Sequence, residues 1–109
     1  MTTKKWNDPI HPGEILKEEL EYIGITAALL AEKIDVPKNR IYQIIKGLRN
    51  VTADTAIRLG MFFSQTPDFW MNLQKSYELD VAKEKIGNSM KIIPYQANKN
   101  ELYHPSMSF

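Results

Sequence analysis

The chain has 109 residues, a length that suffices for one domain with a modest core. It has no cysteine, which excludes disulfides, thiolate metal sites and cysteine nucleophiles. Its composition, 43% hydrophobic and 25% charged, is ordinary for a globular protein, and no apolar run approaches the roughly 20 residues that span a bilayer. The first residues lack the apolar stretch of a secretory signal, so we expect a cytoplasmic protein with no membrane partner.

The net charge of +1 hides an uneven distribution. Between Val36 and Asn50 the charged residues are all cations, whereas between Glu14 and Tyr22 they are four glutamates and one lysine. Local charge predicts nucleic-acid binding better than the total charge does. We therefore expect a positively charged surface around residues 36–50.

The first predicted elements are a leader and two helices. Residues 1–11 form the leader, and a helix follows over residues 12–23, with Gly24 ending it. Its apolar side consists of Ile15, Leu16, Leu20 and Ile23. Thr26 is a suitable cap for a second helix that carries Leu29, Leu30 and Ile34 on its apolar side.

The spacing from Ile25 to Thr52 predicts a helix-turn-helix. Ala31 is small where two helices would cross, and Asp35 tolerates a left-handed turn better than most residues. Pro37 suits the first position of the third helix, which we expect to end at Gly47. Its apolar positions recur at helical spacing and predict one buried face, made of Ile41, Ile44, Ile45 and Leu48.

Two further helices and a tail complete the chain. Thr52 is the predicted cap of a fourth helix whose apolar stripe is Ala56, Leu59, Gly60 and Phe63. The fifth helix opens with Thr66 as cap and Pro67 in its first turn, and runs to about Lys85. Pro94 restricts any strand in the tail to an edge. The expected fold is all-α: a leader (1–11), a compact five-helix domain (12–86) and an irregular or edge-strand extension (87–109).

The polar face of the third predicted helix has the chemistry of DNA recognition. Asn and Gln pair with adenine and Lys with guanine in the major groove, so Lys38, Asn39 and Gln43 are the candidate base readers. Tyr42 is suited to a phosphate or a thymine methyl group. The candidate phosphate contacts are Arg40, Lys46 and Arg49, which set register but carry little sequence information.

The fourth and fifth helices carry more apolar surface than a short helix pair needs. Most of it is expected in the core, and the remainder predicts a homodimer interface, because helix-turn-helix proteins commonly bind two half-sites as dimers. The residues predicted for this interface are Phe69, Trp70, Leu73 and Tyr77.

Enzyme and cofactor motifs are absent from the sequence. His11 and His104 are the only histidines, and neither has the partner four residues away that a metal pair on a helix needs. There is no phosphate-binding glycine loop and no serine elbow. We predict no catalytic residue, no metal and no cofactor.

Four blocks, in this order, resemble the HigA branch of type II antitoxins within the Xre, or lambda-repressor-like, helix-turn-helix family. They are HPGEILKEEL from His11, VPKNRIYQIIKG from Val36, TADTAIRLGMFF from Thr52 and TPDFWMNLQKSYEL from Thr66. Two positions depart from the wider pattern: Ala27 replaces a common glutamine that supports DNA contact, and Asp35 replaces the usual turn glycine. The tail from Met90 onward lies outside the resemblance.

The resemblance implies an antitoxin that binds a RelE-like, ribosome-dependent mRNA-cleaving toxin and represses their shared operon as a dimer on a palindromic operator. Such toxins are basic because they act on ribosomal RNA, so an acidic and apolar surface should bind them. The leader and first helix offer one, and the predicted toxin contacts are Trp6, Ile10, Glu14, Ile15 and Glu18.

Two other functions remain open at this stage. One is a stand-alone transcription regulator without a toxin, which shares every DNA-binding residue with the antitoxin. The other is an interaction scaffold that has lost DNA binding, which the lack of acidic residues in the 36–50 segment disfavours. An adjacent reading frame that encodes a small basic protein would favour the antitoxin.

Overall fold

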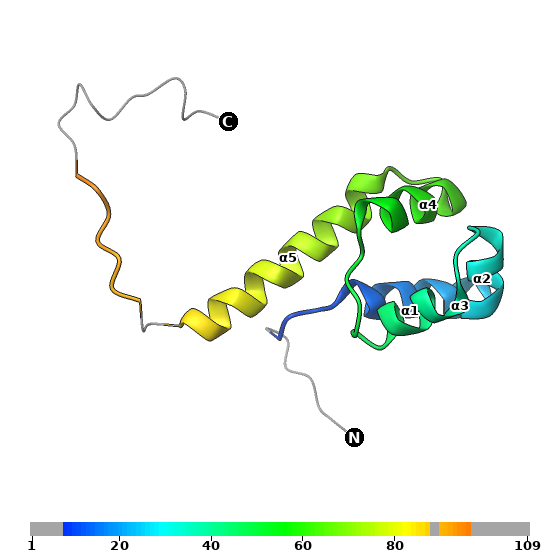
Figure 1. Cartoon of the computed structure of the whole chain (residues 1–109), viewed down its shortest axis with the longest axis horizontal. Helices are drawn as coiled ribbons and strands as arrows, with labels where there is room; N and C mark the ends of the chain where they lie inside the picture. Colours follow the sequence, from blue (N-terminus) through cyan, green and yellow to red (C-terminus); the bar gives the residue numbers. More distant parts are fainter. Residues whose placement is uncertain (1–7, 88–89, 97–109) are drawn as a thin grey trace.

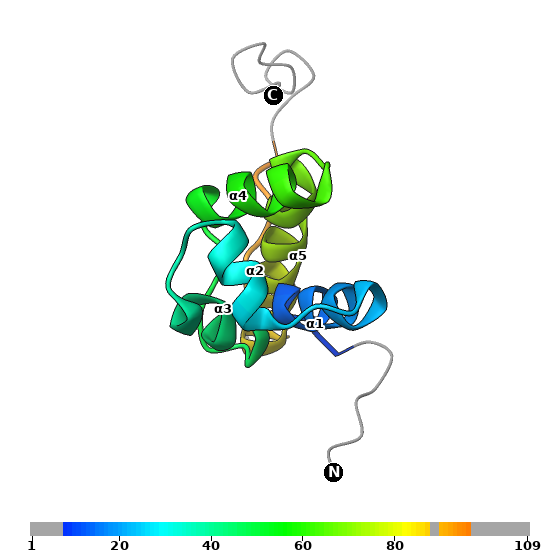
Figure 2. The same cartoon turned by 90° about the vertical axis from the view of Figure 1, so that its right-hand side faces the viewer.

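The computed structural model describes residues 8–87 and 90–96, and its regular structure is entirely helical, as predicted (Figure 1). The helices are α1 (Pro12–Ile23), α2 (Ala27–Lys33), α3 (Lys38–Ile45), α4 (Ala53–Phe63) and α5 (Pro67–Ile86). Helix α3 packs against α1 and α2, while α5 packs against α4 and α1. The first four helices gather at one end of α5, whose other end extends beyond them (Figures 1 and 2).

Helix α1 begins with a capping box built on a histidine. The Nδ1 atom of His11 accepts a hydrogen bond from the Gly13 N–H (2.9 Å), and the Glu14 carboxylate accepts one from the His11 N–H (3.1 Å). The His11 ring is 5% exposed and contacts Tyr77 of α5 edge-on, with 4.8 Å between ring centroids. His11 therefore starts α1 and joins it to α5.

The three predicted threonines all occupy N-cap positions, and two of them make a side-chain cap bond. Thr26 accepts a hydrogen bond from the Leu29 N–H (3.1 Å), and Thr52 accepts a longer one from the Thr55 N–H (3.5 Å). Thr66 occupies the N-cap position of α5, as predicted, but its side chain makes no cap bond. The Phe69 N–H reaches the backbone carbonyl of Thr66 instead (3.2 Å), and Pro67 supplies a suitable φ for the first turn.

The helix-turn-helix lies where the spacing predicted it. Asp35 adopts the left-handed conformation with φ 58°, as expected. Pro37 is the residue before α3 rather than its first residue, and α3 ends at Ile45, two residues before the predicted Gly47. The turn and the start of α3 were thus predicted to within one residue.

The core contains side chains from all five helices and from the loop after α3. Its buried apolar members are Leu16, Leu20, Leu30, Ala31, Ile34, Ile41, Ile44, Val51, Ala56, Leu59 and Trp70. Leu48, predicted on the buried face of the third helix, is 75% exposed. That prediction is wrong because the helix has already ended, so the helical phase that directs Ile41 and Ile44 inward does not reach it.

Two contacts fix the outer helices on this core. A Cβ atom on Gly13 would lie 1.8 Å from the carbonyl oxygen of Ile44, so α1 and α3 approach each other more closely than any other residue type allows. Gln74 of α5, 2% exposed, accepts a hydrogen bond from the Val51 N–H (2.8 Å). This bond ties α5 to the segment that follows α3.

Residues 90–96 form no strand and lie apart from the helical body (Figure 1, orange). Of the two predicted forms of this part of the tail, the structure has the irregular one. Its apolar side chains are exposed, with Ile92 at 74% and Ile93 at 85%. Across the described residues, no helix has the length and apolar character needed to cross a membrane.

Candidate nucleic-acid interface

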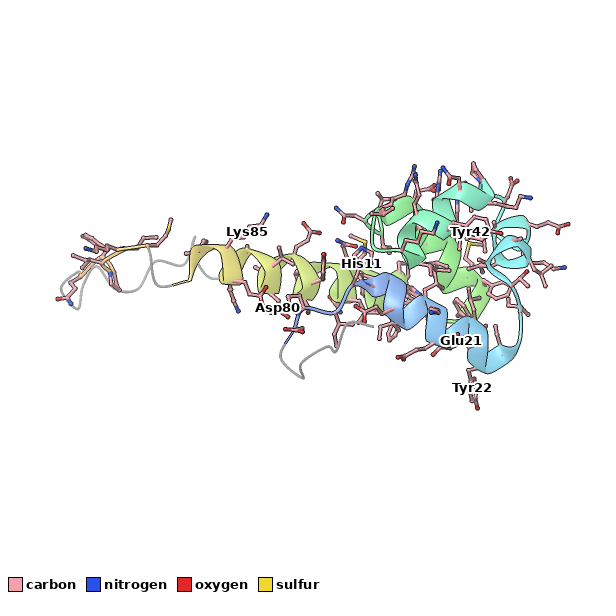
Figure 3. All side chains as sticks on the ribbon, turned by 90° about the horizontal axis from the view of Figure 1, so that it is seen from below. His11, Glu21, Tyr22, Tyr42, Asp80 and Lys85 are labelled. Atoms are coloured by element: carbon pink, nitrogen blue, oxygen red, sulfur yellow. The ribbon has the colours of Figure 1, made fainter. Side chains whose placement is uncertain are left out.

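The polar face of α3 is exposed or half-buried along the helix. Lys38, Asn39 and Tyr42 are exposed, while Gln43 and Arg40 are half-buried. Lys46 follows directly as the cap of α3, and Arg49 lies in the next loop; both are exposed. Helical spacing puts Lys38, Asn39, Tyr42, Gln43 and Lys46 on one face, Arg49 bonds Gln43 beside them, and Arg40 pairs with Asp54 of α4. Figure 3 shows Tyr42 on one side of the molecule, with Glu21 and Tyr22 of α1 on the other.

The Gln43 side chain is held in place by Arg49, one of the residues predicted to contact phosphate. The Arg49 Nε–H donates a hydrogen bond to the Gln43 Oε1 atom (2.9 Å). The bond leaves the Gln43 amide NH₂ group available as a donor on the exposed face, and it orients the amide plane. A residue outside the helix thus pre-orders one inside it.

Arg40 has a partner that sequence reasoning missed. Its Nη1 atom donates to the Asp54 carboxylate of α4 (2.7 Å), and the Arg58 Nε–H donates to the same oxygen (3.1 Å). The hydrogen bond from Arg40, together with Arg58, holds the pKa of Asp54 below its ordinary value. Asp54 therefore stays ionised to lower pH than an ordinary aspartate, and both bonds weaken when the pH falls through this lowered pKa.

Asp54 also changes the charge of the surface that α3 presents. The 36–50 segment has no acid, yet the fold places this carboxylate from α4 beside it. Arg40 and Asp54 line a shallow cavity of about 410 Å³ with Arg49 and Arg58. The i, i+4 spacing of Asp54 and Arg58 is visible in the sequence, but their approach to α3 depends on tertiary packing.

A second surface lies between the start of the chain, α1 and α5. Ile10, Ile15, Leu73 and Tyr77 line a groove of about 290 Å³, together with Ser76 and two carboxylates, those of Asp8 and Asp80. Ile10 and Ile15 were predicted at the toxin contact, and Leu73 and Tyr77 at the dimer interface. The structure thus combines parts of two expected sites in one acidic and apolar groove.

Two of the remaining predicted contacts, Trp70 and Glu14, have roles within the fold. Trp70 is fully buried within one chain, so its assignment to a dimer interface is wrong: its ring packs on Phe63 and Phe69, and its Nε1–H donates to Gln65 (3.0 Å). Glu14 is half-buried and its carboxylate completes the capping box, which gives it a structural role. Trp6 lies outside the described residues.

The other predicted contacts lie at the surface. Phe69, expected at the dimer interface, is 39% exposed, and Ile10, expected at the toxin contact, is 48% exposed. Glu18 is exposed on α1. These three side chains are therefore available to a partner in the arrangement that the structure shows.

Comparison with known proteins agrees with this architecture. The helix-turn-helix family profile matches residues 16–70. Virulence-associated protein I of Dichelobacter nodosus is 42% identical over 86 residues, which cover 78% of this chain and 80% of that protein.

Two solved structures are similar in both fold and sequence. One is an addiction module antidote protein of the HigA family from Coxiella burnetii, with 46% identity and a TM-score of 0.78, covering 81% of this chain and 99% of that one. The other is the antitoxin HigA of Pseudomonas aeruginosa, solved with the higBA promoter, with 41% identity and a TM-score of 0.77 over the same shares. The chain therefore belongs to the helix-turn-helix family, in its HigA branch.

Proposed function

We propose that this protein is a DNA-binding antitoxin that binds its operator through α3, represses its operon as a dimer and neutralises a RelE-like mRNA-cleaving toxin. The exposed amide and basic face of α3 is the observation that carries the proposal. Further support comes from the 41% identity with an antitoxin solved with its promoter.

In this proposal the exposed residues of α3 divide into readers and phosphate contacts. Lys38, Asn39 and Gln43 face base edges from the first two turns, where a recognition helix enters the major groove. Tyr42 contacts a phosphate or a thymine methyl group. Lys46 and Arg49 contact the backbone, and Arg40 does so with the guanidinium donors that Asp54 leaves available.

Substitution of the readers tests the assignment. Asn39→Ala or Gln43→Ala should weaken operator binding by about 1–3 kcal/mol and relax preference at one base position. Lys46→Ala should weaken binding to every sequence similarly and lower the salt slope by roughly one. Fluorescence anisotropy with operator and with scrambled DNA, each at several salt concentrations, measures both effects.

Glu84→Ala, on the far end of α5, is the control for handling and folding, since it leaves the α3 face unchanged. Equal losses for operator and scrambled DNA in the reader variants would show that Asn39 and Gln43 do not read bases.

The dimer proposal involves one side of α5, on which Phe69 is exposed and Leu73 and Tyr77 are half-buried. Phe69, Leu73 and Tyr77 recur at i, i+4 and i+8, so they share one face of the helix, and a two-fold interface there would use the same patch twice. Operators of this class present half-sites about 34 Å apart, which a dimer spans.

Phe69→Glu should give monomers and sharply weaker operator binding, because it places a charge in the proposed interface. Phe69→Leu, the matched control, should remain dimeric. Analytical ultracentrifugation at several concentrations distinguishes the two states. A wild-type protein that sediments as a monomer at tens of micromolar would contradict the dimer.

The toxin proposal uses the side of the acidic and apolar groove formed by Asp8, Ile10 and Ile15, while Leu73 and Tyr77 on its α5 side belong to the dimer proposal. Asp8 and Asp80 flank apolar side chains there, a combination that accepts a cationic residue with an aliphatic stem. Glu18 adds negative charge on the exposed side of α1. Since Glu21 and Tyr22 lie on the opposite side from Tyr42 (Figure 3), a toxin bound along α1 leaves the α3 face accessible to DNA.

Reversing the charge of this surface tests the proposal without removing the cap of α1. Ile10→Arg combined with Glu18→Lys should abolish rescue of cells from the toxin encoded beside this gene, while operator binding stays unchanged. Glu84→Lys combined with Ile86→Arg, both at exposed positions, changes the net charge by the same +3 and is the charge-matched control. Full rescue by the double variant would exclude this surface and leave the outer part of α5 or the tail as the toxin contact.

A further inference from the structure

The turn before the recognition helix contains a conformation that its residue type disfavours. Asp35 has φ 58°, a left-handed value in which a Cβ atom crowds the following carbonyl group. The Asp35 N–H reaches the Glu32 carbonyl at 3.3 Å, and the Val36 N–H reaches that of Ala31 at 3.0 Å. These backbone bonds use the N–H groups of the turn and leave its last carbonyl groups, those of Ile34 and Asp35, to other donors.

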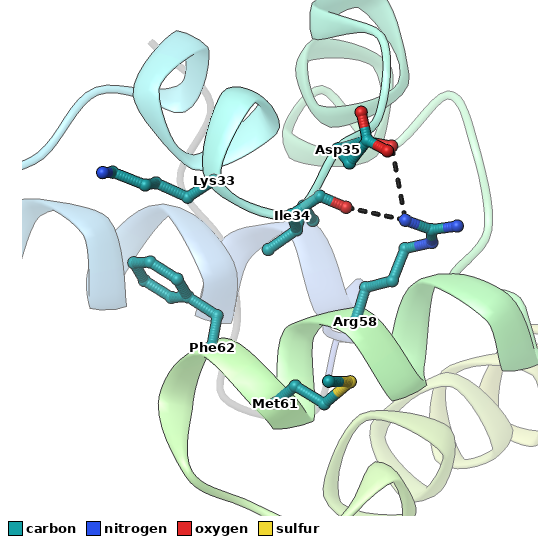
Figure 4. Close-up of a pocket in the computed structure, with 6 residues that line it drawn as sticks. All are labelled: Lys33, Ile34, Asp35, Arg58, Met61 and Phe62. Atoms are coloured by element: carbon teal, nitrogen blue, oxygen red, sulfur yellow. Dashed lines mark hydrogen bonds between the residues drawn. The ribbon is translucent and has the colours of Figure 1, made fainter.

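Arg58 of α4 supplies those donors. Its Nη1 atom donates to the Ile34 carbonyl at 2.8 Å and is 3.3 Å from that of Asp35 (Figure 4). Its Nε–H donates at the same time to Asp54. Because a guanidinium group is planar and rigid, bonds at two of its nitrogens fix its orientation as well as its position.

The other bond of Asp54 extends this arrangement to α3 itself. The carboxylate that holds Arg58 also accepts from Arg40, in the first turn of α3, at 2.7 Å. Helix α4 thus bonds both the turn that precedes α3 and the first turn of α3. Since α4 packs against α5, these bonds fix the start of α3 relative to the rest of the body.

We propose that Arg58 is a positioning residue for DNA recognition: by holding the carbonyl groups of Ile34 and Asp35, it sets the orientation at which α3 presents Asn39 and Gln43 to base edges. The proposal rests on the proposed function, since it assigns Arg58 to the recognition step. Base-edge hydrogen bonds depend on donor–acceptor distance and angle, so a small rotation of α3 weakens them, whereas phosphate attraction tolerates it.

The test compares variants of the full chain for binding to operator and to random DNA of equal length. Arg58→Met keeps the aliphatic stem and removes the donors, and Arg58→Lys keeps the charge but cannot bond the turn and Asp54 through a rigid fork. Lys33 lines the same pocket as Asp35 and Arg58 (Figure 4), and Lys33→Met is the control that removes one positive charge. No hydrogen bond or ion pair of the Lys33 side chain is found in the described part of the chain. Asp35→Gly is added to Arg58→Met, because glycine adopts φ 58° without strain.

We expect Arg58→Met to lower operator affinity about tenfold, the size of one lost base contact, and random-DNA affinity no more than Lys33→Met does. The operator affinity of Arg58→Lys should lie between those of wild type and Arg58→Met. The double variant Arg58→Met with Asp35→Gly should regain most of the operator preference. Equal losses on both DNAs in Arg58→Met would overturn the proposal and make Arg58 a phosphate contact. A double variant that does not regain the preference for operator over random DNA would also overturn the proposal.

A measurement on the free protein separates this proposal from the proposed function. The backbone amide NMR signals of Asp35, Val36 and the first turn of α3 should shift in Arg58→Met and stay in place in Lys33→Met. If wild-type protein shows no operator preference, the proposed function fails. The NMR signals still test whether Arg58 fixes the carbonyl groups of the turn. Unchanged signals in Arg58→Met would overturn the role of Arg58 whatever the DNA result.

Discussion

Gly13→Ala is expected to destabilise the protein by about 3 kcal/mol or more, because the added methyl group would overlap the backbone carbonyl of Ile44. The built Cβ lies 1.8 Å from that oxygen and 2.7 Å from its carbon, so α1 and α3 must separate before the side chain fits. Helix propensity alone predicts the opposite sign, since alanine is favoured over glycine in a helix by about 0.8–1 kcal/mol.

Thermal unfolding followed by circular dichroism measures this effect as a fall in Tm of roughly 12–24 °C. Gly24→Ala is the matched control: its Cβ meets nothing within 4 Å, but its φ is 77°, so only backbone strain of about 1–2 kcal/mol applies. A Gly13→Ala protein that melts at or above the wild-type Tm would show that α1 and α3 do not pack as closely as described.

Trp70→Ala is expected to cost about 3–5 kcal/mol of unfolding free energy, the range for removal of a large aromatic side chain from a core. Trp70 is 0% exposed and packs edge-on against Phe69, with 5.1 Å between ring centroids. It also donates to Gln65, whose oxygen would lose its protein partner.

Trp70→Phe should lose less, about 1–2 kcal/mol, because most of the ring packing remains and chiefly the N–H donor disappears. Urea denaturation at two protein concentrations tests both the size and the origin of the loss. A loss that depends on concentration would place Trp70 in an interface between chains. Equal stability losses at both concentrations are expected of a core residue.

Local patterns in the sequence predicted most of the fold. The 3.6-residue spacing of the apolar positions, the threonines before three helices and the tolerance of Asp35 for a left-handed turn are all properties of short segments. The prediction of the buried face failed where it extended the helical periodicity beyond the end of α3. Leu48 has the right spacing for the buried face, but the helix stops at Ile45.

The partners of the site residues depend on contacts between distant segments. The lack of acids in the 36–50 segment correctly located a basic surface, yet Asp54 approaches it from α4 and binds Arg40. Nothing in the spacing of residues 34 and 58 signals that a guanidinium group would bond a carbonyl group 24 residues earlier. Trp70 was misassigned because an aromatic surplus shows how much apolar surface exists without showing which side chain lies inside.

The uneven packing along α5 has a consequence for dynamics. Trp70 and Gln74 anchor its first half, whereas from Asp80 to Ile86 every side chain except Val81 is exposed. This end of α5 extends beyond the other helices (Figure 1). A helical stretch without tertiary packing is only marginally stable in water, so amide hydrogen exchange should quicken progressively toward Ile86. A partner that packs along this outer part would slow the exchange there, and the ordering would give the association an unfavourable conformational entropy.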